Sequence, residues 1–143
     1  MELEEIEEMI RKGKTVEEIL SVVDWKEFEE KVEEIFKRHE FETKRNFRFK
    51  TSKRFEVDII AEKRNIVFIV DCKQWGKGRY KFSPLRKAAE KQIERVKALK
   101  QTFIGLKKEI IPIIVTFFDE GIYEFNGVFI VPVFKLNNFL LGY

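Results

Sequence analysis

The segment from Ile66 to Lys73 constrains the fold more strongly than any other part of the chain. It reads Ile-Val-Phe-Ile-Val-Asp-Cys-Lys, so five apolar residues, four of them β-branched, precede an acid and a base two positions apart. An apolar run of this length is too short for an ordinary helix and is typical of a strand buried on both faces. Asp71 and Lys73 would project from one face of that strand, roughly 7 Å apart. Because ligand sites in open α/β sheets lie at the carboxyl ends of strands, we expect a site here.

A second apolar segment, Phe55 to Ala61, carries Asp58 in its centre. The polar residues 62–65 predict a turn that returns the chain beside the first strand. Two adjacent strands would then hold Asp58, Asp71 and Lys73 together, which suits a divalent metal ion with a lysine beside it. The simpler alternative is a structural ion pair between Lys73 and either aspartate at a strand end.

The chain is long enough for one domain with its own core. We divide its 143 residues into a helical N-terminal extension (1–23), a core (25–117) and a C-terminal hairpin with a closing segment (118–143). The single cysteine excludes a disulfide framework and fits a reducing compartment. No apolar run reaches the roughly 18 residues of a membrane-spanning helix, and the acidic N-terminus does not resemble a signal peptide. These features predict a soluble, cytoplasmic protein.

Charge is distributed unevenly along the chain, although the formal net charge is only +3. Residues 1–34 contain thirteen acids and five bases, whereas residues 73–108 contain twelve bases and two acids. Residues 37–54 add eight bases and two acids, so basic segments flank the expected site on both sides in sequence. A polyanionic substrate such as DNA or structured RNA would account for this pattern. A solvated lysine-rich face is the alternative.

Three amphipathic helices are expected before the strands, at about residues 1–11, 15–22 and 25–38. The apolar stripe of the third helix consists of Trp25, Phe28, Val32, Ile35 and Phe36. Glu29 lies at the edge of this stripe, where an acid either reaches solvent harmlessly or faces a site.

Two segments near the expected site combine aromatic and basic residues. The strand expected at residues 40–50 alternates aromatic and polar residues and has a basic outer face. The glycine-containing loop at residues 74–80 could follow a phosphate backbone and stack on a base, although Trp75 and Tyr80 are equally well explained as core anchors. The candidate nucleic-acid contacts are Arg45, Arg48, Lys53, Arg54, Trp75, Lys77, Arg79 and Lys81.

A long helix is expected at residues 83–101, with Ser83 as its cap and Pro84 at its first position. Gln92 falls within the apolar stripe of this helix. A buried amide there must find a partner, either in the backbone or at the site.

The C-terminal part predicts a buried strand at 110–117, a hairpin at 123–130 around Asn126-Gly127, and a short helix at 135–141. The hairpin and the end of the chain are rich in apolar residues for a surface region. We therefore expect a homodimer that uses part of this surface.

The order helix, strand, strand with Asp, strand with Asp-x-Lys, helix, strand resembles the core of the PD-(D/E)xK nuclease superfamily. The similarity covers about residues 25–116 and is greatest to Mrr-type restriction endonucleases and archaeal Holliday junction resolvases. Val57-Asp58 resembles the family's first acidic half-motif, and Asp71-Cys72-Lys73 resembles its (D/E)-x-K. Glu29 stands where these families carry an acid on the first core helix, and Gln74 follows the lysine as in the Mrr group.

Three positions depart from the family's pattern. Val57 stands where a proline is common, a change that is usual in these subgroups, and Asp71 replaces the commoner glutamate with a shorter side chain that the motif allows. Thr51-Ser52-Lys53-Arg54 stands where Mrr-type proteins often have a glycine-rich turn.

The resemblance implies an α/β fold with a restriction-endonuclease-like core, a mixed central β-sheet flanked by helices, and an N-terminal helical extension. It implies a Mg²⁺- or Mn²⁺-dependent endonuclease that hydrolyses phosphodiester bonds in DNA. The catalytic residues would be Asp58, Asp71, Lys73, Glu29 and Gln74. The metal ion would be held by Asp58, Asp71, the backbone carbonyl of Cys72 and, through water or at a second ion, Glu29. Lys73 would orient or deprotonate the attacking water and stabilise the pentavalent phosphate.

Two other classes of function remain open from the sequence. A nuclease-like fold that binds nucleic acid without cutting it is one, and metal-dependent cleavage would separate it from a nuclease. The other is a small-molecule α/β enzyme, which the chain supports less well because it has neither a glycine-rich phosphate-binding motif nor a Ser-His-Asp arrangement.

Overall fold

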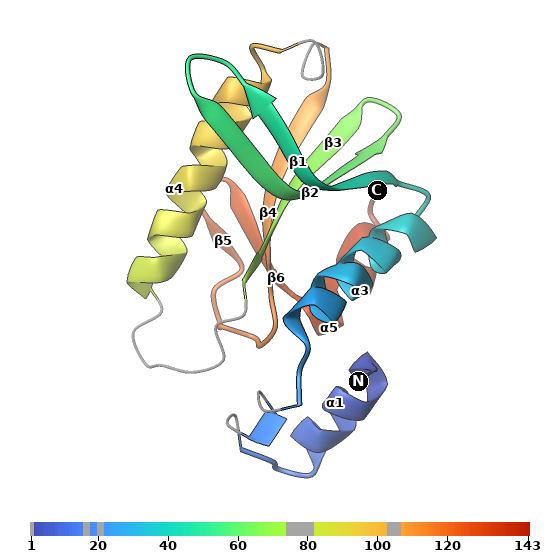
Figure 1. Cartoon of the computed structure of the whole chain (residues 1–143). Coiled ribbons are helices and arrows are strands. Elements are labelled where there is room, and N and C mark those ends of the chain that lie inside the picture. The colour runs from blue at the N-terminus through green and yellow to red at the C-terminus, as the bar shows by residue number, and fades with distance from the viewer. Residues whose placement is uncertain (1, 16–17, 20–21, 74–81, 103–106) are drawn as a thin grey trace.

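A mixed six-stranded sheet forms the centre of the molecule, and helices cover both of its faces (Figure 1). The computed structural model describes residues 2–15, 18–19, 22–73, 82–102 and 107–143. In chain order its elements are α1 (Leu3–Arg11), α3 (Trp25–Arg38), β1 (Glu42–Lys50), β2 (Arg54–Lys63), β3 (Ile66–Lys73), α4 (Phe82–Leu99), β4 (Glu109–Thr116), β5 (Glu124–Phe125), β6 (Val128–Pro132) and α5 (Val133–Leu140). The expected α/β architecture with a helical N-terminal extension is confirmed.

The strands lie in the order β1-β2-β3-β4-β6-β5. β2 runs antiparallel to both of its neighbours, β1 and β3, whereas β4 and β6 run parallel to β3, and α4 provides the crossover from β3 to β4. The predicted hairpin is confirmed, because Asn126 and Gly127 have φ angles of 51° and 84°, as a type I′ turn requires. The pairing of β6 with β4 was not predicted, since it joins segments that no local signal connects.

β3 is a central strand and is buried on both faces, as its apolar run predicts. Phe68 and Val70 belong to the core cluster that includes α3 and α5, whereas Val67 and Ile69 pack with Leu99 of α4. These four β3 residues are fully buried. The two helical layers therefore fix β3 from both sides, and its carboxyl end carries the polar residues.

α3 begins where the sequence predicts, whereas the helix predicted at 15–22 lies partly outside the described residues. The Asp24 carboxylate accepts the backbone N–H of Lys26 at 3.0 Å and opens α3, and Thr15 Oγ1 accepts the backbone N–H of Glu18 at 3.1 Å. The prediction for Ser83 was wrong, because α4 begins at Phe82 and Ser83 lies in its first turn instead of capping it. None of the helices in the described residues is long and apolar enough to cross a membrane.

The sheet opens at the acidic position of β2. β2 and β3 pair as far as Ile59 and Val70, so the next positions in this register are Asp58 and Asp71. On the other side of β2, Asn46 stands opposite Asp58 outside the ladder, and its φ is 52°, a left-handed conformation that asparagine tolerates better than most residues. β2 is thus unpaired on both sides at Asp58, which leaves room for a site beside Asp71.

Candidate active site

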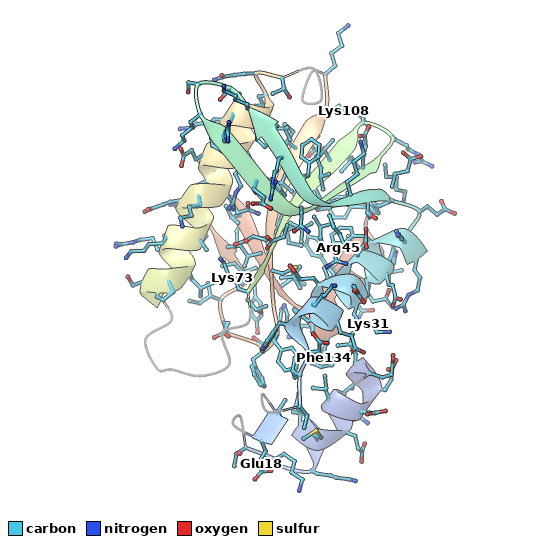
Figure 2. All side chains as sticks on the ribbon, in the orientation of Figure 1. Glu18, Lys31, Arg45, Lys73, Lys108 and Phe134 are labelled. Carbon is cyan, nitrogen blue, oxygen red and sulfur yellow. The ribbon has the colours of Figure 1, made fainter. Side chains whose placement is uncertain are left out.

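A pocket of about 680 Å³ lies at the carboxyl end of β3 and receives side chains from both helical layers. Figure 2 shows Lys73 at this end of the sheet, between α3 and α4. The pocket is lined by Trp25, Lys26, Phe28 and Glu29 of α3, Asp58 of β2, Asp71, Cys72 and Lys73 of β3, and Arg95 of α4. Four of the predicted catalytic residues, Glu29, Asp58, Asp71 and Lys73, therefore share one pocket.

The two aspartates are held in different ways. Asp58 Oδ2 accepts the backbone N–H of Cys72 at 2.9 Å, which connects β2 to β3 beyond the end of their ladder. Asp71 is 5% exposed, and its Oδ2 has no hydrogen-bond partner among the described residues. The same oxygen lies 3.3 Å from Lys73 Nζ, a charge pair outside hydrogen-bonding geometry. A buried carboxylate oxygen without a donor is unfavourable and marks a place for a ligand.

Burial raises the pKa of the Asp71 carboxyl from 3.8 to about 6. The positive charges of Lys73 and Arg95 oppose this rise, whereas the nearby Asp58 adds to it. The protein thus keeps a carboxylate where water cannot stabilise its charge, and a cation in the pocket would favour the ionised form.

Glu29 and Cys72 experience the same concentration of negative charge. Burial raises the pKa of Glu29, with Asp58 adding to the rise and Arg45 opposing it. Burial raises the pKa of the Cys72 thiol, and the negative charges of Asp58, Glu29 and Asp71 add to this rise. The Cys72 side chain packs against the core cluster of α3 and α5. Within the described residues, no three His, Cys, Asp or Glu side chains are close enough to hold a metal ion by themselves.

The predicted nucleic-acid contacts of β1, β2 and their connection form two groups. In the first group, Arg45 Nη1 lies 3.6 Å from Glu30 Oε1 of α3, and Figure 2 shows Arg45 beside this helix. Lys53 forms an ion pair with Glu94 of α4. Arg48, with a side chain 80% exposed, and Arg54 lie on the surface. Arg48 also lies 3.7 Å from a carboxylate oxygen of Glu56 on the neighbouring strand β2, but this pair is exposed, so Arg48 and Arg54 can both reach a large ligand, whereas Arg45 and Lys53 connect the strands to the helices. The predicted residues Gln74, Trp75, Lys77, Arg79 and Lys81 lie outside the described residues.

Arg95 is a pocket residue that the sequence analysis did not identify. Gln92, one helical turn earlier, is fully buried, and its Nε2 donates to the carbonyls of Ile69 and Ile113 at 3.0 and 2.8 Å. Its Oε1 accepts Arg95 Nη1 at 2.9 Å. Both interpretations of Gln92 therefore hold, because the amide binds the backbone and also contacts a pocket residue. The sequence contained one indication of Arg95: it follows the buried Gln92 by three residues, so the two side chains are neighbours on the same face of the helix.

A mixed sheet with an Asp and an Asp-x-Lys at the separating ends of two adjacent strands defines a PD-(D/E)xK-like nuclease. Residues 20–116 match the family model of the Mrr catalytic domain, described as a restriction endonuclease. The chain belongs to this restriction endonuclease family.

The chain is also similar to other proteins and solved structures. An uncharacterized protein from Archaeoglobus fulgidus is 39% identical over 118 residues, which cover 81% of this chain and 88% of the relative. The small subunit of the heterodimeric restriction endonuclease R.BspD6I has the same fold, with a TM-score of 0.57 and 13% identity over 98% of this chain and 77% of that subunit. A solved protein of unknown function is similar with a TM-score of 0.49 and 19% identity over 79% of this chain, which spans 54% of that protein.

Proposed function

We propose that the protein is a metal-dependent endonuclease that hydrolyses phosphodiester bonds in DNA. The observation that carries this proposal is the meeting of Asp58, Asp71 and Lys73 in one pocket, with a buried Asp71 oxygen that lacks a donor in the described residues. Membership of a restriction endonuclease family supports DNA as the substrate.

Mg²⁺, or Mn²⁺ in its place, fits this donor set. Hard divalent cations prefer carboxylate and carbonyl oxygens and keep several waters, so two aspartates and one backbone carbonyl suffice. Asp58 and Asp71 would hold the cation together with the carbonyl of Cys72, and Glu29 would interact with it through water. When bound, such a cation lowers the pKa of a coordinated water and neutralises charge on the phosphate.

Lys73 supplies the positive charge that the chain itself brings to the reaction. Its side chain is 33% exposed and its Nζ lies beside Asp71, so it can face both the bound phosphate and the attacking water. In the proposed reaction Lys73 orients this water and stabilises the pentavalent phosphate. Gln74, the next residue along the chain, is proposed to assist it.

The β1–β2 hairpin is proposed as part of the DNA-binding surface. Its end carries a hollow of about 560 Å³ lined by Arg48, Phe49, Lys50, Arg54, Phe55 and Glu56. The rings of Phe49 and Phe55 stack, with centroids 5.2 Å apart and planes 13° apart. Basic side chains beside an aromatic surface can neutralise phosphates and contact the sugars or bases between them.

We expect the affinity for duplex DNA to fall steeply with salt. The logarithm of the association constant should decrease linearly with the logarithm of salt concentration, with a slope near −0.9 per phosphate contact. Arg48→Ala and Arg54→Ala should each make the slope shallower by about one, because each removes one contact. Fluorescence anisotropy of a labelled duplex in EDTA measures this, and Lys12→Ala on the exposed end of α1 is the matched control. A flat salt response of the unmodified protein would exclude binding through phosphates.

We also expect self-association through the C-terminal region. Tyr123 and Leu141 are large side chains that are 50% and 73% exposed, and a hollow of about 470 Å³ lies beside Tyr123 and Phe139. A homodimer would remove this apolar surface from water. Sedimentation velocity should detect the dimer, and Leu141→Asp should weaken it. Monomer at every concentration would contradict this expectation.

A panel of labelled nucleic acids tests the proposed function and defines the substrate. Linear, branched and single-stranded DNA and structured RNA would be incubated with the protein in Mg²⁺, Mn²⁺ or EDTA. The proposal requires metal-dependent cleavage of at least one DNA. Binding to DNA without cleavage of any member would instead identify a non-catalytic nucleic-acid-binding module.

A further inference from the structure

Gln92 has only one arrangement of its amide that satisfies its surroundings. Its Nε2 faces the carbonyl oxygens of Ile69 in β3 and Ile113 in β4, and both can only accept hydrogen bonds. The Oε1 atom must therefore point away from the strands. Because the side chain is fully buried, the sheet backbone fixes its direction.

Arg95 is held by that fixed oxygen. Its Nη1 donates to Gln92 Oε1 at 2.9 Å, and the residue lines the pocket that contains Asp58, Asp71 and Lys73. A guanidinium has five N–H donors, so this bond leaves most of them for another group. The chain thus brings a positioned cation to the pocket from the helical layer opposite α3.

The positive charge of Arg95 interacts with the carboxylates of Asp71 and Glu94 but pairs directly with neither in the part of the chain that the structure describes. There it forms no ion pair with a carboxylate, whereas Lys73 is paired with Asp71 and Arg86, earlier in α4, with Glu90. Its charge reaches the site, since it lowers the pKa of Asp71 against the effect of burial. A half-buried cation that is not directly paired with an anion is unfavourable, and a bound anion would relieve this.

We propose that Arg95 binds a non-bridging oxygen of the nucleic-acid phosphate in this pocket and that Gln92 is its positioning residue. This inference rests on the proposed function, because it takes the phosphodiester as the ligand of the pocket. A planar guanidinium suits a phosphate because it can donate two parallel hydrogen bonds to two oxygens. Lys73 and Arg95 would then contact the phosphate from two different elements, β3 and α4.

Variants of Arg95 test this role against a matched control on the same helix. Arg86→Ala removes the same charge from α4 at a side chain that is 51% exposed and does not line the pocket. We expect Arg95→Ala to lower kcat/KM for DNA cleavage by about 10²-fold or more, as loss of a transition-state donor does. Arg95→Lys should recover part of this loss, because it restores the charge without the two-pronged geometry. Equal activity of Arg95→Ala and Arg86→Ala would overturn the proposal.

Chemical rescue separates contact with substrate from a structural effect. Guanidinium ion added at concentrations below those that unfold the protein should restore part of the cleavage by Arg95→Ala and none by Asp58→Asn. Gln92→Met keeps the size of the side chain but removes its hydrogen bonds, so in its folded fraction it should show a smaller loss of cleavage than Arg95→Ala. Absence of rescue in folded Arg95→Ala would contradict direct contact with the phosphate.

A binding measurement judges Arg95 even if the protein does not cleave DNA. The affinity for a short labelled duplex in Ca²⁺ should fall roughly tenfold in Arg95→Ala, as expected for one hydrogen bond to a charged group, and much less in Arg86→Ala. If the unmodified protein binds but never cleaves, the proposed function fails while this difference still supports Arg95. Equal affinities of the two variants would reject the role of Arg95 whether or not the protein cleaves.

Discussion

Replacement of Asp58 or Asp71 by asparagine should lower DNA cleavage by at least about 10³-fold while folding and DNA binding persist. The expected asymmetry has a physical cause. Binding is distributed over many lysines and arginines, each contributing a little, whereas stabilisation of the transition state depends on one cation and its ligands. Removal of a negative charge from the pocket should, if anything, tighten DNA binding by reducing repulsion of the phosphate. Cleavage rates and anisotropy measured on the same preparations compare the two properties.

The other pocket residues provide a graded comparison. Lys73→Ala should also remove most cleavage, and Glu29→Gln should cause a smaller loss, because Glu29 is proposed to act on the metal ion only through water. Glu62→Gln is the matched control, since it removes an acid from β2 at the end away from the pocket, where Glu62 pairs with Lys108. If Asp58→Asn unfolds the protein while the remaining folded fraction still cleaves DNA, the acids are structural and the nuclease proposal is wrong.

Asp71→Asn should also increase the free energy of unfolding of the metal-free protein above about pH 6. Burial raises the pKa of Asp71 in the folded state to about 6, above its usual 3.8. Below about pH 4 the carboxyl is protonated in both states, so it has little effect on the free energy of unfolding. As the pH rises towards 6, the unfolded chain releases a proton that the folded protein retains, and stability falls. Since one pKa unit corresponds to about 1.4 kcal/mol, the ionised carboxylate should destabilise the fold by on the order of 2–3 kcal/mol.

Urea unfolding in EDTA measures this effect in the unmodified protein and in Asp71→Asn. The variant should be the more stable of the two near pH 8, and the difference should disappear near pH 4. Mg²⁺ near pH 8 should stabilise the unmodified protein and have little effect on the variant, because a ligand stabilises only the state that binds it. If Asp71→Asn is instead less stable near pH 8, the pair with Lys73 is a stabilising ion pair, as the structural alternative holds.

The strands and helices that carry the predicted site could be derived from the sequence because their signals are local. The apolar run of β3 fixed its bounds at Ile66 and Lys73, and the cap at Asp24 fixed the start of α3 and hence the face on which Glu29 lies. The two-residue spacing of Asp71 and Lys73 was enough to infer a shared strand face. Each of these conclusions depends only on residues that are close in sequence, within the same strand or within one or two turns of the same helix.

The rest of the site depends on contacts between distant segments. No local pattern showed that Gln92 would reach carbonyls of β3 and β4, or that Arg95, which donates to Gln92, would line the pocket. The ion pairs of Arg45 and Lys53 also depend on distant segments. The sequence predicted these two residues only as nucleic-acid contacts, whereas in the structure they pair with acids of α3 and α4. The gap in the β1–β2 ladder opposite Asp58 coincides with a left-handed Asn46, a conformation that asparagine permits but does not require.

The most direct test of the central claim is the metal dependence of cleavage in the unmodified protein and in Asp58→Asn, purified in parallel. Protein stripped with EDTA would be mixed with the best DNA of the panel and titrated with Mg²⁺. The proposed function predicts no cleavage in EDTA, recovery of cleavage as Mg²⁺ is added to the unmodified protein, and none with the variant at any concentration. Cleavage that persists in EDTA, or equal Mg²⁺-dependent cleavage by both proteins, would show that the pocket of Asp58 and Asp71 is not the active site.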